Sequence, residues 1–411
     1  MSFPDPVPLV ACLLILTLVG GFGLLLAQRY GYFTPALVSF ILHLLVGGTL
    51  YASAGLWAPD AMSYDRSGYT IARIWTDNYA HAPTITAGKE GYPTVLAAMY
   101  ATLGHIPALG VCLNIGLSTI LVPVVALTAK RAELPDRTTA WLAAAFPAFL
   151  LWGSLGLREA ASWLLLAIVV LGLVSLSHIS EHHSPNELLD WSMIIAGILG
   201  LLWIRGTLAV LVAGAVMLTA IPVSRRKLFP LFGGLAATIL AGPALMSQFS
   251  RVAGGYGVDE VNTVRSSLSN NATTAYDVQE YSSVFGMVTS SPELLLRALF
   301  GPFPWEWPGV GPLFTIDALL WGGAMFLVII GCRGRQWLRL LPFLIPAFAI
   351  MISLALTSGN YGTMQRLRIQ AIIMVLPLVA AGWERLRELR KQGLVSARQD
   401  TPGRQALQKN N

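Results

Sequence analysis

The chain of 411 residues is 55% hydrophobic, has a mean hydropathy of +0.63 and carries 12% charged residues. A soluble domain usually carries about 25% charged residues, so this composition excludes an ordinary soluble protein and predicts an integral membrane protein. The net charge of +6 does not require a nucleic-acid partner, since membrane proteins collect Lys and Arg in cytoplasmic loops. Cys12, Cys112 and Cys332 lie far apart in apolar surroundings, which argues against a disulfide framework.

Long apolar runs recur along the chain, and a helix needs roughly 20 apolar residues to cross a bilayer. Arg158-Glu159 divides the run from 138 to 177, and Arg205-Gly206 divides the run from 188 to 222, where we expect a hairpin. The sequence therefore predicts an all-α, polytopic bundle of about eleven transmembrane helices. They fall at 7–27, 35–56, 107–129, 138–154, 159–177, 188–204, 206–222, 228–246, 312–331, 340–357 and 367–383.

The distribution of Lys and Arg predicts the orientation, because cytoplasmic loops are enriched in both. The best separation of charge places the N-terminus outside and the C-terminus in the cytoplasm of a multi-pass cell-membrane protein, the inner membrane where there are two. Residues 1–384 then form one transmembrane domain with large outer loops at 57–106 and 247–311. The basic, polar tail at 385–411 is predicted to be disordered and cytoplasmic.

The first outer loop contains the charged stretch WAPDAMSYDRSGYTIARIW, residues 57–75. Its apolar and aromatic residues follow helical spacing and predict an amphipathic helix lying in the membrane interface. They are Tyr64, Gly68, Ile71, Ala72 and Trp75. A second short helix is expected to begin near Pro93 and to end at Gly104, because proline suits a first helical turn and glycine a helix end.

Three acids of this loop are candidates for chemistry. Asp60 either caps the amphipathic helix or acts as a general base that takes a proton from an acceptor hydroxyl. Asp65 is the alternative base, or a solvated acid beside Arg66. Glu90 is a third candidate, or a charge on the rim.

Four arginines stand at predicted outer ends of spans, where positive charge is normally sparse: Arg158, Arg205, Arg366 and Arg368. Arginines at such positions often anchor a helix or pair with a neighbouring acid such as Glu159. A group of four on one side also suits phosphate, because the guanidinium fork matches phosphate oxygens. We therefore predict that they bind the phosphate of a lipid-linked substrate.

Other features point in the same direction or to nothing specific. Trp305, in the Pro- and Trp-rich stretch before span 312–331, anchors the chain in the interface or forms part of a wall for lipid or sugar. His178, His182 and His183 with Glu181 are interpreted as a solvated loop. The sequence has no Walker phosphate loop, indicates no metal site or cofactor, and leaves a divalent metal open.

Four short motifs resemble the GT-C superfamily of polytopic glycosyltransferases, in particular bacterial relatives of dolichyl-phosphate-mannose protein mannosyltransferases and of the lipid A aminoarabinose transferase. They are Asp60 in PDAMSYDRSGYTIA, Gly91 to Pro93 in GYPTVLAAMY, residues 146–160 (FPAFLLWGSLGLREA) and residues 359–370 (GNYGTMQRLRIQ). Two departures are that Asp60 has no adjacent second acid and that one more span precedes the first large loop.

The resemblance implies an inverting transfer of a sugar from a polyprenyl-phosphate donor to a glycan, lipid or protein acceptor of the cell envelope, without nucleic acid. Asp60 would be the base, with Tyr64 beside it, and the four arginines would hold the donor phosphate. Three alternatives stay open: a polysaccharide polymerase or ligase that uses lipid-linked glycans, a lipid or glycan transporter of the flippase type, and a non-catalytic assembly partner in which Asp60 and the arginines are anchors.

Overall fold

The computed structural model describes residues 7–77, 90–177, 187–220, 258–269, 274–276, 280–307 and 311–399. Predicted features that lie outside these residues include the span at 228–246, the histidines of residues 178–183 and the last part of the tail, 400–411. The described residues form helices throughout, with an isolated β-bridge between Ala275 and Asn360. The all-α prediction is therefore confirmed for the described part of the chain.

The first half of the chain forms nine α-helices and a π-helical turn, in the order α1 (Val7–Ile15), η1 (Leu16–Gly20), α2 (Gly21–Tyr30), α3 (Phe33–Ala54), α4 (Pro59–Asp77), α5 (Gly91–Leu103), α6 (Ala108–Arg131), α7 (Asp136–Ala145), α8 (Pro147–Gly153) and α9 (Glu159–Leu176). The described remainder forms α10 (Glu187–Ala220), α13 (Val258–Ser269), α14 (Val284–Phe300), η3 (Pro304–Glu306), α16 (Pro312–Cys332), η4 (Trp337–Arg339), α17 (Leu341–Thr357) and α18 (Tyr361–Gln399).

Seven helices in the described part of the chain are long and apolar enough to cross a membrane, by length and composition. They begin at Val7, Phe33, Ala108, Glu159, Glu187, Phe314 and Tyr361. The difference from about eleven has several sources: span 228–246 lies outside the described residues, spans 188–204 and 206–222 form the single helix α10, and two further spans are divided or short. Pro147 divides the predicted span at 138–154 into α7 and α8, because the residue before a proline, here Phe146, adopts an extended conformation. α17 falls just short of a full span at 17 residues.

The predicted interruptions are present. Arg205 has the non-helical backbone angles φ −153° and ψ 76°, so α10 consists of two helical pieces that meet at this residue. Residues 154–158 separate α8 from α9. At the C-terminus α18 continues to Gln399, so the helix extends into the segment 385–411 that the sequence predicts to be disordered. The strong helix formers of the segment ERLRELRK explain this extension.

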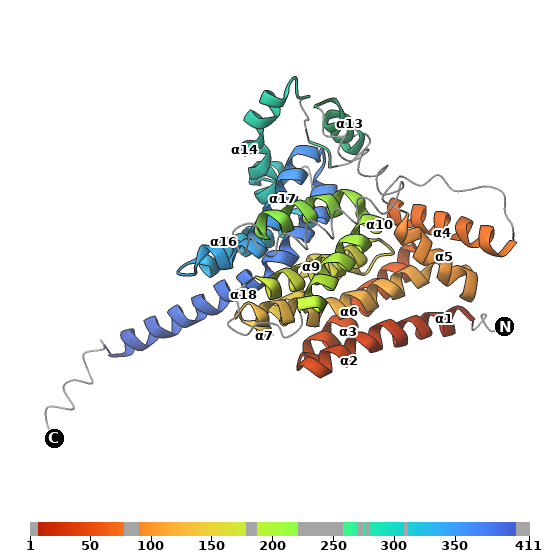
Figure 1. Ribbon diagram of the computed structural model, residues 1–411, viewed down its shortest axis with the longest axis horizontal. Helices are drawn as coiled ribbons and strands as arrows, with labels where there is room; N and C mark the ends of the chain where they lie inside the picture. The colour runs from red at the N-terminus through yellow and green to blue at the C-terminus, as the bar shows by residue number, and fades with distance from the viewer. Residues whose placement is uncertain are drawn as a thin grey trace.

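The helices α6, α9 and α18 form the centre of the bundle, because most of each apolar window is buried, whereas α1–α3 and α16 are largely exposed at the periphery. Figure 1 shows α4 and α5 together at one end, α13 and α14 at the top of the view, and the last part of α18 extending away at lower left. The amphipathic helix expected in the first loop is α4, and it buries Ala61, Tyr64, Gly68 and Ala72 as one stripe. The short helix expected after it is α5.

A group of charged residues lies at the end of α6, at the start of α10 and in the turns that follow α6 and α16. Arg339 pairs with Glu133 at 3.4 Å, and Arg131 pairs with the buried Asp190 at 3.1 Å. Beside Arg339 lies a hollow of about 260 Å³, which Arg335 and Gln336 also line. These residues belong to segments that the charge distribution assigns to the cytoplasmic side, so the two ends of the bundle carry separate charged groups.

Two glycines set the crossing of α16 and α18. A Cβ atom added to Gly331 would collide with the carbonyl oxygen of Leu378, and one added to Gly382 would collide with that of Leu327. The backbones of the two helices therefore touch at this point, which small residues permit in membrane helices. Pro377 lies inside α18, just before Leu378 of this crossing.

We expect Gly331→Ala to lower the free energy of unfolding by about 1–3 kcal/mol, because the added methyl group meets backbone that cannot move aside. Gly322→Ala, on the same helix, is the matched control, since a Cβ there meets nothing within 4 Å. Thermal unfolding in detergent micelles would compare the two variants. Equal stability of both would contradict the glycine contact.

Candidate functional site

Six of the predicted site residues lie together. Asp60 and Tyr64 come from α4, Arg158 and Glu159 from the start of α9, Arg205 from the break in α10, and Arg366 from the second turn of α18. We call Asp60, Arg158, Glu159, Arg205 and Arg366 the arginine–carboxylate cluster. Its members are up to 306 positions apart in the sequence, so the fold gathers them.

Glu159 is the centre of the cluster. Its Oε1 lies 3.3 Å from Arg366 Nε and 3.6 Å from Arg205 Nη1, and its side chain is 1% exposed. Glu159 stands in the first turn of α9, where a negative charge interacts favourably with the helix macrodipole. A buried carboxylate between two guanidinium groups ties α9 to both α10 and α18.

Arg158 and Arg205 are buried beside it, at 7% and 6% exposure. Arg158 Nη1 donates a hydrogen bond of 3.1 Å to the carbonyl oxygen of Ile204, next to the break in α10. Irregular backbone at membrane depth persists where protein covers it, and Arg158 provides part of that cover. The break in α10 thus brings Arg205 and the Ile204 carbonyl to the same place.

Asp60 closes the exposed side of the cluster. Its Oδ2 accepts a hydrogen bond of 2.6 Å from Arg366 Nη1, and its side chain is 47% exposed. One helical turn later, Tyr64 lies under the Arg158 guanidinium, with 5.9 Å between the guanidinium carbon and the ring centroid. Burial raises the pKa of Tyr64 and the charge of Arg158 opposes this in part, so its hydroxyl stays protonated at neutral pH.

The cluster has more donors than acceptors. Three guanidinium groups face two carboxylates, which leaves one positive charge in excess among these five side chains. Arg158 Nε is buried and has no hydrogen-bond partner in the described part of the chain, whereas Arg205 Nη1 and Arg366 Nε face Glu159 Oε1 in ion pairs that are not hydrogen bonds. Buried polar atoms are normally satisfied, so an anion with several acceptor oxygens would complement this arrangement.

The remaining predicted residues lie elsewhere. Arg368 donates to the carbonyl of Gly301, pairs with Asp317 and packs over the ring of Trp321 at 5.5 Å. Residues two positions apart in a helix point about 200° apart around its axis, so Arg366 and Arg368 cannot face the same site. The structure therefore places Arg368 in a separate contact between α16 and α18.

Asp65 faces a different partner from Asp60. Its carboxylate accepts a hydrogen bond of 2.7 Å from the Tyr100 hydroxyl and lies 3.1 Å from His105 Nε2. The His105 ring stacks on Tyr69 at 4.1 Å. These contacts join α4 to the end of α5, and burial together with the Asp65 hydrogen bond raises the pKa of Tyr100. Of the two aspartates proposed as the base, Asp60 is the one that contacts a cluster arginine, Arg366.

Glu90 precedes α5, and its Oε2 is buried with no hydrogen-bond partner among the residues described. The neighbouring Gly91 packs against the backbone of Trp203, since a Cβ there would lie 2.8 Å from that carbonyl oxygen. Trp305 is 74% exposed and stacks on Phe303 with 4.8 Å between ring centroids. Neither residue has a recorded contact with the three arginines.

Sequence reasoning missed a second polar network, which joins α14 to the start of α18. Arg297 contacts both Glu306 and the Tyr361 hydroxyl, and that hydroxyl donates to Glu306 Oε2 at 2.6 Å. Burial opposes ionisation of Arg297 and Glu306, but their hydrogen bonds outweigh it, so the pKa of Arg297 is raised and that of Glu306 is lowered. The network fixes the start of α18, five residues before Arg366.

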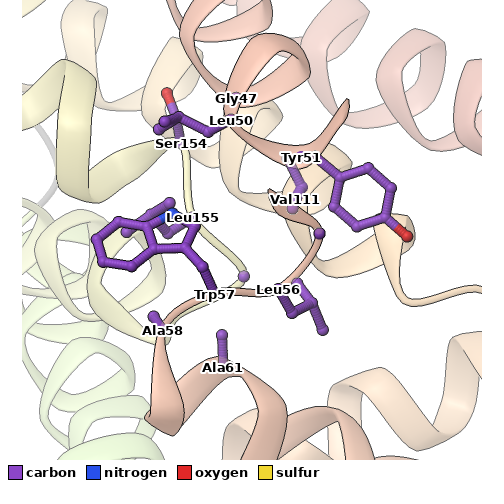
Figure 2. Close-up of a pocket in the computed structure, with 12 residues that line it drawn as sticks. Gly47, Leu50, Tyr51, Leu56, Trp57, Ala58, Ala61, Val111, Ser154 and Leu155 are labelled. Atoms are coloured by element: carbon purple, nitrogen blue, oxygen red, sulfur yellow. The ribbon is translucent and has the colours of Figure 1, made fainter. Parts of the chain in front are cut away.

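A small pocket adjoins the cluster. The end of α3, the start of α4, Val111 of α6 and residues 154–156 line it. Figure 2 shows Leu56 and Trp57 between α3 and α4, with Trp57 beside Leu155. The lining is mostly apolar, and it ends at Ala61 and Gly156, next to Asp60 and two residues before Arg158. An apolar surface thus leads to a cationic one.

Comparison with known proteins adds no further assignment. No protein-family model matches the chain, and no significant match to a curated protein or to a solved structure was found. Among the described residues, no group of three or more His, Cys, Asp and Glu side chains could hold a metal ion. The geometry of the cluster is therefore the basis on which a function is inferred.

We expect Glu159→Gln to lower the free energy of unfolding by about 3–5 kcal/mol, because it leaves the buried Arg205 guanidinium without its counter-charge and Arg366 with Asp60 alone. Glu293→Gln is the matched control: Glu293 also pairs with an arginine, at 3.9 Å, but its side chain is 78% exposed, so a change within about 1 kcal/mol is expected. Unfolding in detergent micelles measures both. Similar losses in the two variants would contradict a central role for Glu159.

Proposed function

We propose that this protein is a membrane glycosyltransferase of the GT-C type, which moves a sugar from a polyprenyl-phosphate donor to an acceptor of the cell envelope. The observation that carries the proposal is the meeting of Arg158, Arg205 and Arg366 with Asp60 in one partly open cluster. Glu159 accounts for the approach of Arg205 and Arg366, but the group still has one positive charge in excess. A shared anionic ligand would neutralise that charge.

The ligand that fits the cluster best is a phosphodiester. Guanidinium groups present a planar fork that matches phosphate oxygens, and buried N–H donors interact with an anion more strongly than exposed ones. The N-terminus of α9, beside Arg158, adds backbone dipoles of the favourable sign. We therefore assign Arg158, Arg205 and Arg366 to the phosphate of the donor.

The apolar residues around the pocket of Figure 2 favour a donor that is a lipid, which would lie along their surface, because the hollow itself, about 10 Å³, is too small to enclose an isoprenoid chain. Leu56, Trp57 and Leu155 offer an apolar lining that ends beside Ala61 and Gly156, next to Asp60 and close to Arg158 in the sequence. A phosphate linked to an isoprenoid chain has the same sequence of properties, an apolar tail followed by an anionic group. A soluble sugar nucleotide would gain nothing from this lining.

The proposed reaction needs a base and a stabilised leaving group. The acceptor hydroxyl oxygen attacks the anomeric carbon, the bond from this carbon to the phosphate oxygen breaks, and its electron pair stays on the phosphate. Asp60 accepts the proton from the acceptor hydroxyl. The arginines stabilise the additional negative charge on the released polyprenyl phosphate. Attack from the side opposite the phosphate inverts the anomeric configuration.

The same proposal includes the membrane topology. We propose about eleven spans with the N-terminus outside, so that the cluster lies at the outer end and the Arg131–Asp190 and Arg339–Glu133 pairs at the cytoplasmic end. The separation of these charged groups along α6, which ends at Arg131, supports this orientation.

The test is a transfer assay with purified protein in nanodiscs and a panel of radiolabelled polyprenyl-phosphate sugars with envelope extract as acceptor. We expect Asp60→Asn to reduce transfer by about 100-fold or more, the usual contribution of a general base, and Arg366→Ala and Arg158→Ala to raise the donor concentration needed.

Asp77→Asn and Arg73→Ala are matched controls, because Asp77 and Arg73 form an exposed ion pair of 3.3 Å at the other end of α4. Both should transfer at the wild-type rate. Transfer at the wild-type rate by all three cluster variants would contradict the proposed glycosyltransferase activity. Activity with diphosphate-linked glycans alone would favour a polymerase or ligase, and movement of the lipid across the bilayer without transfer would favour a flippase.

A further inference from the structure

Arg366 is held between two carboxylates of unequal mobility. Glu159 lies at its Nε and is 1% exposed, whereas Asp60 lies at its Nη1 and is 47% exposed. Glu159 is enclosed by α9, α10 and α18, so it cannot leave without disturbing the bundle. Asp60 stands in the first turn of α4 at the open side, where solvent or a ligand can reach its carboxylate.

The guanidinium group offers its N–H donors along two edges. The edge that contains Nε faces the buried Glu159, so a ligand arriving from the open side meets the Nη end first. That end is where Asp60 Oδ2 accepts its hydrogen bond of 2.6 Å. A phosphate that uses this end of Arg366 must therefore take the place of the Asp60 carboxylate.

We propose that the Asp60–Arg366 ion pair is a latch that the donor phosphate displaces, so that Asp60 becomes available as a base when the donor is bound. This inference rests on the proposed function, and it adds an order of events to it. While the pair is closed, the guanidinium stabilises the negative charge of Asp60 and makes it a weaker base. When phosphate takes over Arg366, Asp60 regains its basicity beside the anomeric carbon.

The latch also accounts for release of the product at the end of the reaction cycle. Transfer places one proton on Asp60 and one further negative charge on the phosphate, which is now a monoester. The protonated Asp60 cannot pair with Arg366, so the product phosphate keeps the arginine until Asp60 loses its proton to water. The ionised Asp60 then competes again for Arg366 and assists the departure of the polyprenyl phosphate.

The direct test is the affinity for a short phosphate probe, farnesyl phosphate, in nanodiscs. We expect Asp60→Asn to bind this probe about 3–10-fold more tightly than the wild type, because the competing carboxylate is gone. Farnesol, which lacks the phosphate, should bind both equally. Asp77→Asn removes a carboxylate from the same helix without touching Arg366, and it should leave the affinity unchanged. Equal or weaker binding of farnesyl phosphate by Asp60→Asn would overturn the latch.

A double-mutant cycle separates the latch from a general effect of charge. If Asp60 acts through Arg366, the gain from Asp60→Asn disappears in an Arg366→Ala background. A gain of the same size in that background would show long-range electrostatics and would also overturn the latch. Asp60→Ser gives a second variant of the same kind should Asp60→Asn fold poorly.

The outcomes keep the two proposals apart. Loss of transfer by Asp60→Asn without tighter binding of farnesyl phosphate would leave the glycosyltransferase standing and remove the latch. If Asp60→Asn transferred sugar at the wild-type rate, Asp60 would not be the base. The latch would then fail too, whatever the affinity for farnesyl phosphate.

Discussion

The buried contact of Glu159 with Arg205 and Arg366 is the interaction on which the rest of the site depends. A carboxylate at this depth is costly unless it is paired, and two guanidinium groups would repel each other without it. The pairing determines where the break in α10 and the start of α18 must lie relative to α9. Arg158 then lies beside the break in α10, and Asp60 lies beside Arg366. The arrangement of the cluster thus follows from the buried charge of Glu159.

The network of Arg297, Glu306 and Tyr361 supports the same arrangement from outside the cluster. It attaches the segment that follows α14 to the first residue of α18. Arg366 begins its contacts little more than one turn later, so a rigid start of α18 limits how far its guanidinium can shift. Charged groups that such supports hold are preorganised. The segment from α14 to η3 therefore contributes to the site although none of its described residues touches the cluster directly.

Much of the fold follows from local sequence. Apolar runs predict the helices, the spacing of Tyr64, Gly68 and Ala72 predicts α4, and isolated charges predict the breaks at residues 158 and 205. The separation of Arg366 from Arg368 also follows from helix geometry, since neighbours two positions apart face opposite sides. The partners of Asp65 and the central place of Glu159 could not be predicted, because they depend on which distant helices pack together. Short-range spacing carries no information about a contact between residues 60 and 366.

Pro377 has a consequence for how α18 holds the site. It lies in α18 between Arg366 and the glycine crossing with α16, and proline cannot donate the backbone hydrogen bond that would stiffen the helix there. The ladder of backbone hydrogen bonds is therefore interrupted about 16 Å from Arg366, at 1.5 Å per residue. On the Arg366 side of the proline, Gln365 donates to the Phe314 carbonyl and Arg368 pairs with Asp317, so side chains hold that part of α18 on α16. The position of Arg366 thus depends on polar side-chain contacts, whereas the crossing depends on glycines that have no side chain.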